Sequence, residues 1–248
     1  MVKSSGFITG VASALGLPEP TVSGAFRALR ENGLMTSGAR GVNAPDMTDL
    51  DAARMLIAML VNERPAYAER SVRDFGQLIC LGSYPVDCTG LSDEVREMVE
   101  QAAADFTMEA RGLGDRHTFE QAVAELIRMY GDDREKDYWL RSQVEIPERG
   151  RFDPHTKIEV TPGYLEARIS MQGNIYTYFD RYLDPSTLSQ DDDLESISAD
   201  LGAEETYNLK KAPYSTAIRS SRWVDTPRIT ALALVIREGG TPPESSLS

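Results

Sequence analysis

Residues 11–41 read VASALGLPEPTVSGAFRALRENGLMTSGARG, and this stretch predicts two helices joined by a tight turn. Apolar residues recur at helical spacing from Phe7 to Leu15, which indicates the first helix. Gly16 ends that helix, and Pro18 prevents its continuation because proline has no amide hydrogen to donate. The chain then has room for a second helix that runs in a new direction.

The second helix is expected to begin at Pro20–Thr21 and to end at Asn32–Gly33, since asparagine and glycine both tolerate a left-handed cap. Its apolar residues fall at i, i+3, i+4 and i+7 and form one buried stripe: Val22, Ala25, Phe26 and Leu29. The opposite face carries small or hydrogen-bonding residues and then two arginines: Thr21, Ser23, Gly24, Arg27 and Arg30. Small residues allow close approach, and arginine reaches phosphates or guanine edges, so this face suits contact with nucleic acid.

A glycine-rich loop is expected after the second helix. Leu34–Met35 would begin a short strand, and Thr36–Gly41 would form the tip of the loop. This arrangement places Arg40 where it can lie against a phosphate backbone or in a minor groove.

The pattern ALGL-PE-x-TVS-x-A-x-R-x-LRE-x-GL resembles the winged helix-turn-helix of bacterial and phage regulators over about 40 residues. The resemblance implies that the second helix enters the major groove of double-stranded DNA. Thr21, Ser23, Gly24 and Arg27 would then face bases and nearby phosphates, while Arg30 and Arg40 would hold the backbone. Too little chain precedes Phe7 for the additional first helix of such domains, so the helix after Pro45 is expected to complete the three-helix core.

The charge distribution is uneven along the chain. The net charge is −13, but residues 1–45 carry four basic and two acidic residues, a net +2, which leaves −15 for the remainder. An acidic body would be repelled by phosphates, so DNA contact is expected at the N-terminal part alone. A weakly basic contact binds weakly and is sensitive to salt, and we therefore expect a homodimer or a higher homo-oligomer.

Helical patterns continue to Tyr130. Helices are expected at Thr48–Val61, Pro65–Leu81, Asp93–Arg111 and Thr118–Tyr130, with a loop at Gly82–Gly90. The first of these has an N-cap at Thr48 and is apolar around most of its circumference, so it should be buried.

The pattern changes after Tyr138. Strands joined by turns are expected at Lys157–Thr161, Leu165–Met171, Ile175–Phe179 and Tyr214–Val224. Asp180–Glu205 has nine acidic residues and one basic residue, which is typical of a solvated or disordered loop. A final helix should begin at Asp225 or Thr226, with Pro227 in its first turn.

These patterns predict an α+β protein with an N-terminal winged helix-turn-helix, a helical middle region, and a C-terminal antiparallel β-rich region with a final helix. The expected parts are a DNA-binding domain at 1–63, a helical region at 64–131, an α+β domain at 138–238, and a flexible tail at 239–248.

Residues with catalytic or metal-binding chemistry do not form a recognisable pattern. His117 and His155 have no partner at metal-ligand spacing and are expected at the surface, and Cys80 and Cys88 lack the spacing of a zinc site. Phosphate-binding glycine loops and nucleophile motifs are missing. We expect no enzyme activity, no catalytic residues, no metal site and no cofactor.

A second basic cluster lies near the C-terminus. Arg219, Arg222 and Arg228 surround Trp223 in an otherwise acidic region. One interpretation is a second contact with nucleic acid or with a partner. The other is that these arginines neutralise the acidic stretch nearby, and this second interpretation is favoured.

The favoured hypothesis is a DNA-binding transcriptional regulator of bacterial or phage origin. Two cysteines suit a reducing compartment, and no long apolar run or signal peptide is apparent, so a cytoplasmic protein without membrane contact is expected. One alternative is a DNA-packaging subunit similar to a phage small terminase, which would form a ring. Another is a helix pair that binds only protein.

Overall fold

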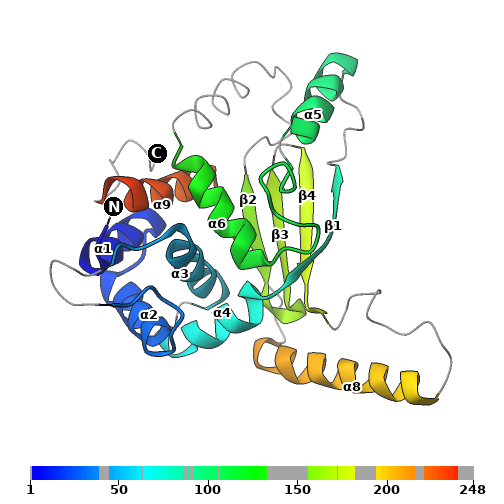
Figure 1. Ribbon diagram of the computed structural model, residues 1–248, viewed down its shortest axis with the longest axis horizontal. Coiled ribbons are helices and arrows are strands. Elements are labelled where there is room, and N and C mark those ends of the chain that lie inside the picture. Colours follow the sequence, from blue (N-terminus) through cyan, green and yellow to red (C-terminus); the bar gives the residue numbers. More distant parts are fainter. Residues whose placement is uncertain are drawn as a thin grey trace.

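The computed structural model describes residues 2–38, 45–62, 64–85, 89, 92–105, 107–132, 156–171, 173–181, 194–215 and 221–239. The fold is α+β, as the sequence predicted: eight α-helices in the described part of the chain accompany a five-stranded antiparallel sheet (Figure 1). None of the helices in those ranges is both long and apolar enough to cross a membrane.

The helices are α1 (Ser4–Leu15), α2 (Glu19–Glu31), α3 (Asp49–Val61), α4 (Ala68–Gly76), α5 (Asp93–Asp105), α6 (Phe119–Tyr130), α8 (Leu194–Lys211) and α9 (Thr226–Glu238). The strands are β1 (Ile79–Pro85), β2 (Lys157–Thr161), β3 (Glu166–Met171), β4 (Asn174–Phe179) and β5 (Arg222–Asp225). They lie in the order β1-β4-β3-β2-β5, so β1 and β5 form the two edges of the sheet.

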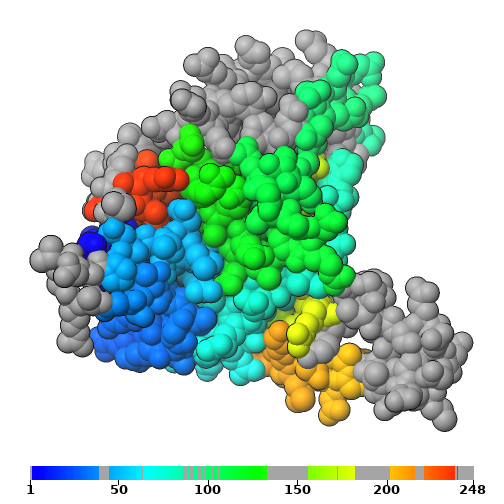
Figure 2. All heavy atoms as spheres, in the orientation of Figure 1, coloured from blue at the N-terminus to red at the C-terminus, as the bar shows by residue number. Residues whose placement is uncertain are grey.

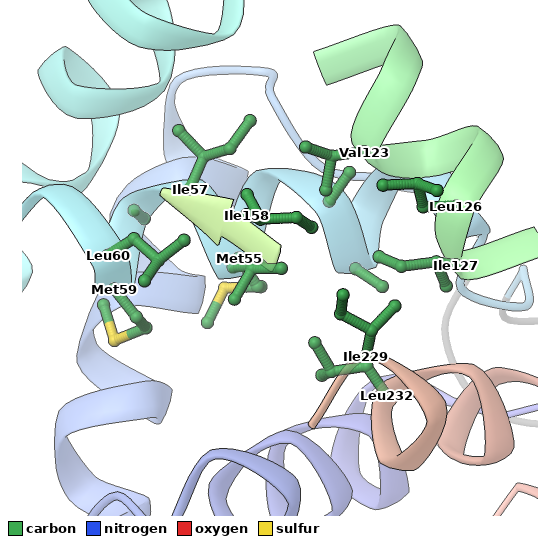
Figure 3. Packing of buried hydrophobic residues seen from close by; sticks show 14 of the residues in the cluster. Met55, Ile57, Met59, Leu60, Val123, Leu126, Ile127, Ile158, Ile229 and Leu232 are labelled. Atoms are coloured by element: carbon green, nitrogen blue, oxygen red, sulfur yellow. The ribbon is translucent and has the colours of Figure 1, made fainter. Parts of the chain in front are cut away.

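One face of the sheet is buried because the strands alternate apolar and polar residues. Ile158, Val160 and Ile169 are fully buried on this face, as are Tyr176 and Tyr178. Helices α3 and α6 lie on that side of the sheet, and Figure 3 shows Ile158 between side chains of these two helices.

Helix α3 is the centre of the structure. It packs against α4, α6, α9 and β2, and its residues from Asp51 to Val61 are buried except Arg54. The Thr48 side chain accepts a hydrogen bond from Asp51 N while Asp51 accepts from Thr48 N, which forms a capping box. A helix that is apolar on all sides needs neighbours on all sides, and the fold supplies them.

A single hydrophobic cluster extends from Val2 to Ile236. Helix α1 packs against α9, so the first and last helices of the chain are neighbours (Figure 1). Residues 1–63, 64–131 and 138–238, which the sequence suggested as separate parts, therefore all contribute side chains to this cluster.

Several predicted elements are confirmed. The structure has helices in the places expected for α1, α2, α3, α6 and α9, and strands in the places expected for β2, β3 and β4. The signals at their ends were strong: Thr118 forms a second capping box with Gln121, and Gly16 and Gly33 have the positive φ that favours glycine.

The helix predicted over Pro65–Leu81 is wrong in its second half. Helix α4 ends at Gly76, and β1 begins at Ile79, where the prediction had helix followed by loop. Cys80 pairs with Tyr178 across the sheet, and this long-range pairing overrides a local pattern that suited a helix. Within the predicted Gly82–Gly90 loop, residues 86–88 and 90 lie outside the described residues, and Cys88 is among them.

Three other expectations also need correction. The helix predicted to reach Arg111 ends at Asp105, and Met108 N instead donates a hydrogen bond to Tyr176 Oη at 3.1 Å. The acidic stretch is not all loop, because α8 begins at Leu194; residues 182–193 lie outside the described ranges. The strand expected over Tyr214–Val224 does not begin at Tyr214, because residues 212–214 form a 3₁₀ turn. Its end corresponds to β5, Arg222–Asp225, and residues 216–220 lie outside the described ranges.

Candidate nucleic-acid interface

The first two helices are joined by a short turn, as the sequence predicted. Gly16 has φ 66° and its amide bonds back to the end of α1, while Leu17 N donates to Ala12 O at 2.9 Å. Pro18 precedes α2 in an extended conformation and Pro20 lies in the first turn of α2. The turn between α1 and α2 is therefore three residues long, Gly16 to Pro18, and its first residue has a positive φ that glycine adopts without strain.

Apolar contacts fix the angle between the two helices. Phe7 of α1 and Phe26 of α2 have ring centroids 6.0 Å apart, and Val22 and Leu29 are fully buried. Helix α2 also packs against α3, α4 and the 3₁₀ turn Pro65–Tyr67. It is thus held from one side while its other side faces solvent.

The predicted contact residues lie at different depths on α2. Arg27 and Arg30 are exposed, whereas Thr21, Ser23 and Gly24 are half-buried. The Arg30 guanidinium lies 5.7 Å from the ring centroid of Phe26, which is one turn earlier in the helix. Figure 2 shows this N-terminal part at the molecular surface, in blue at the lower left.

Gly24 has a role inside the protein. A Cβ atom at this position would lie 2.9 Å from Pro65 Cγ, so the glycine lets the Pro65–Tyr67 turn pack closely on α2. The small residue that the sequence suggested for close approach to DNA is therefore used by an internal contact.

The outward face of α2 has mixed charge. Arg27 and Arg30 are accompanied by the exposed Glu19 and Glu31, so the helix itself is neutral. Lys3, another cation of the N-terminal part, forms an ion pair with Asp46 at 3.0 Å. Any attraction for phosphate depends on the local position of the two arginines, because the summed charge of this helix provides none.

The predicted wing strand is wrong for the residues that the structure describes. Leu34 to Gly38 has no strand conformation. Leu34 O accepts from Arg54 Nη1 at 2.9 Å, and Thr36 N donates to Asp51 Oδ1 at 2.7 Å. Side chains of α3 thus bind the backbone groups that a partner strand would have used. Residues 39–44, with the predicted contact residue Arg40, lie outside the described part of the chain.

His117 is buried, although the sequence suggested a surface position. Its Nδ1 lies 2.8 Å from Gly114 O and its Nε2 lies 2.9 Å from Tyr178 Oη, so both ring nitrogens have partners. Burial raises the pKa of the nearby Cys80 thiol, which favours the unreactive neutral form. In the described ranges, which exclude His155, no three His, Cys, Asp or Glu side chains are grouped as a metal site.

The C-terminal basic cluster is partly assembled in the fold. Arg222, Trp223 and Arg228 line one hollow, whereas Arg219 lies outside the described residues. Leucines from distant segments, Leu15 and Leu56 among them, complete this hollow. No local sequence pattern signals such a site, since four separate elements contribute to it.

Comparison with known protein families, with curated proteins and with solved structures finds no match.

Proposed function

We propose that this protein binds double-stranded DNA through the outward face of α2 and acts as an oligomeric transcriptional regulator. The observation that carries the proposal is the α1–turn–α2 geometry, which leaves Arg27 and Arg30 exposed on a helix that is packed on its other side. A cytoplasmic location and a bacterial or phage origin belong to the same proposal.

Arg27 is the central contact in this account. It lies on the outward face, with Ser23 one turn earlier and Arg30 in the last turn. A guanidinium reaches two guanine acceptors or a phosphate with paired N–H groups. Thr21 and Ser23 would add hydroxyl donors, and Arg40, which lies outside the described residues, would add a further cation.

Oligomerisation follows from the small number of cations. The logarithm of the DNA affinity falls linearly with the logarithm of the salt concentration, with a slope of about −0.9 for each phosphate that the protein neutralises. Two or three arginines neutralise few phosphates, so one copy of the protein should bind DNA weakly. A dimer doubles the contacts and fits two half-sites about 34–36 Å apart. The molecular mass in solution tests this: a dimer supports a regulator, a ring of about eight or more copies favours the packaging alternative, and a monomer at DNA-binding concentrations contradicts the oligomer.

A protein-binding helix pair is the second candidate. The neutral outward face of α2, where Glu19 and Glu31 accompany the arginines, is the observation in its favour. Mixed charge suits a protein surface better than a phosphate backbone.

Selection of genomic DNA fragments by the purified protein separates the two. The DNA-binding proposal predicts enrichment of a common sequence, with affinity that falls as salt rises. Failure to retain any fragment even at low salt would favour the protein-binding alternative.

A further inference from the structure

A hollow of about 610 Å³ lies beside the turn of the helix pair, within the size range of small-molecule sites. Its walls come from the α1–α2 turn, from α3, from the edge strand β5 and from the start of α9. Its lining includes four leucines and two arginines: Leu15, Leu17, Leu56, Leu60, Arg222 and Arg228.

One wall of the hollow is apolar. Leu56 and Leu60 are buried residues of α3, and Leu15 and Leu17 are half-buried on either side of Gly16. A hydrocarbon group placed here would displace water chiefly from Leu15 and Leu17, because Leu56 is 0% and Leu60 is 6% exposed, and the gain is proportional to the apolar area covered.

Two arginines, Arg222 and Arg228, also line the hollow. Arg222 pairs with Val160 and Val224 pairs with Ile158 across the β2–β5 ladder. Directly opposed residues share a face of the sheet, and Ile158 and Val160 are buried against the helices. The Arg222 side chain therefore leaves the strand on the same side as α3.

Arg228 approaches the hollow from α9. It is half-buried, and its Nη1 donates to Ala14 O at 3.1 Å, in the last turn of α1. That bond engages one of five guanidinium N–H groups. Asp225 also lines the hollow, so its ionisable lining residues are two arginines and one aspartate.

We propose that this hollow binds a small organic acid, with its carboxylate on Arg222 and Arg228 and its hydrocarbon part against Leu15, Leu17 and Leu60. A planar guanidinium is suited to paired hydrogen bonds with a carboxylate, and the leucine wall excludes ligands that are charged throughout. A small organic acid therefore makes hydrogen bonds to the arginines and apolar contacts with the leucines at the same time.

The ligand would act as an effector, a role that rests on the proposed DNA-binding function. Leu15 and Leu17 flank the turn that sets the angle between α1 and α2, so a ligand against them changes the free energy of that turn. Binding in the hollow and binding of DNA are then coupled, and the coupling is reciprocal.

Calorimetric titration with octanoate tests the site without DNA. Octanoate, kept below the concentration at which it forms micelles, should bind saturably with a Kd on the order of 1 mM. The neutral analogue 1-octanol should bind at least about tenfold more weakly, because it cannot pair with the arginines. Equal binding of the two compounds, or no saturable binding of octanoate, overturns the proposal.

Two double variants serve as reciprocal controls. Arg222→Gln with Arg228→Gln should remove the preference for octanoate, whereas Arg27→Ala with Arg30→Ala should leave it unchanged. Circular dichroism checks the fold, and Arg222→Gln alone serves if the double variant unfolds. Octanoate preference that persists without Arg222 contradicts the site.

DNA binding measured with and without octanoate then tests the effector role. A changed affinity in the wild type, and none in the Arg222→Gln variant, supports it. Octanoate binding with no effect on DNA overturns only the coupling, and octanoate binding by a protein that binds no DNA overturns the proposed function but not the ligand site.

Discussion

The Tyr130 hydroxyl is buried at the end of α6 and lies 2.6 Å from Thr156 Oγ1. Burial disfavours the phenolate and raises the pKa of Tyr130 to about 12, although bonds to Thr156 and Thr226 oppose the shift. Burial also raises the pKa of Tyr176 to about 12. These phenols lie under the helices, where a negative charge would have no water.

Stability should fall at alkaline pH for this reason. The pKa of Tyr130 is about 12 in the folded state and about 10 in the unfolded chain. The unfolded chain therefore loses this proton first, so the contribution of Tyr130 to folding stability is complete below about pH 10 and is lost as the pH rises towards 12. Between pH 10 and 12 the free energy of unfolding should fall less steeply with pH in Tyr130→Phe than in the wild type, by up to about 1.4 kcal/mol per pH unit. Urea unfolding at pH 8 to 12 measures it, and the exposed Tyr67→Phe is the control. An unchanged slope in the Tyr130 variant would contradict the assignment.

Gly24 gives a second prediction, based on its contact with Pro65. A Cβ at Gly24 lies 2.9 Å from the Pro65 ring, while a Cβ at Gly202 in α8 meets nothing within 4 Å. Gly24→Ala should therefore destabilise the protein by about 1 kcal/mol despite the better helix propensity of alanine. Gly202→Ala should stabilise it by up to about 1 kcal/mol. Thermal unfolding of both variants measures the contrast, and equal shifts of the same sign would refute the packing argument.

At the scale of elements, Asp51 connects α3 to the segment that follows α2. Its carboxylate accepts from Thr36 N at 2.7 Å and from Thr48 N and Thr48 Oγ1 at 2.8 Å, and it is 1% exposed. These bonds replace the strand pairing that a wing would have provided.

Asp51→Asn should cost about 2–3 kcal/mol of unfolding free energy, because an amide cannot accept all three bonds and donors are left buried. Gln121→Ala, in the exposed capping box of α6, is the matched control and should cost less than about 1 kcal/mol. Chemical denaturation measures both values. A loss at Asp51 no larger than at Gln121 would show that the segment after α2 is held in another way.

Elements with local end signals were predictable from the sequence. Gly16, Thr48 and Thr118 define helix ends through their own backbone or side-chain chemistry, and α2 follows its apolar period. Strand β1 was missed because Cys80 is extended only through pairing with Tyr178, about 100 residues away.

Part of the candidate site was predictable from the sequence, and part of it depends on contacts between distant segments. The exposure of Arg27 and Arg30 followed from helical period alone, and the structure has them exposed. The Gly24–Pro65 contact and the hollow beside the turn depend on tertiary packing, so no pattern within the second helix indicates them.

At the scale of the whole molecule, the helix pair shares its core with the C-terminal helix. Helix α1 packs on α9 and α3 packs on α6, so residues 1–63 alone would expose both surfaces. We predict that a fragment of residues 1–63 does not unfold cooperatively, because it lacks those partners. Circular dichroism during heating measures this, and a cooperative transition would show instead that the first predicted domain folds alone.

Fluorescence anisotropy on a DNA fragment that the wild type selects measures the DNA affinity of the Arg27→Ala, Arg30→Ala double variant. This affinity shows whether α2 recognises DNA. Arg96→Ala with Arg73→Ala is the control, since it removes the same charge from α5 and α4. The account predicts at least a tenfold loss for the α2 variant, with a shallower salt dependence, and a loss of less than about threefold for the control. Unchanged affinity in the α2 variant, or equal losses in the two variants, would contradict DNA recognition by α2.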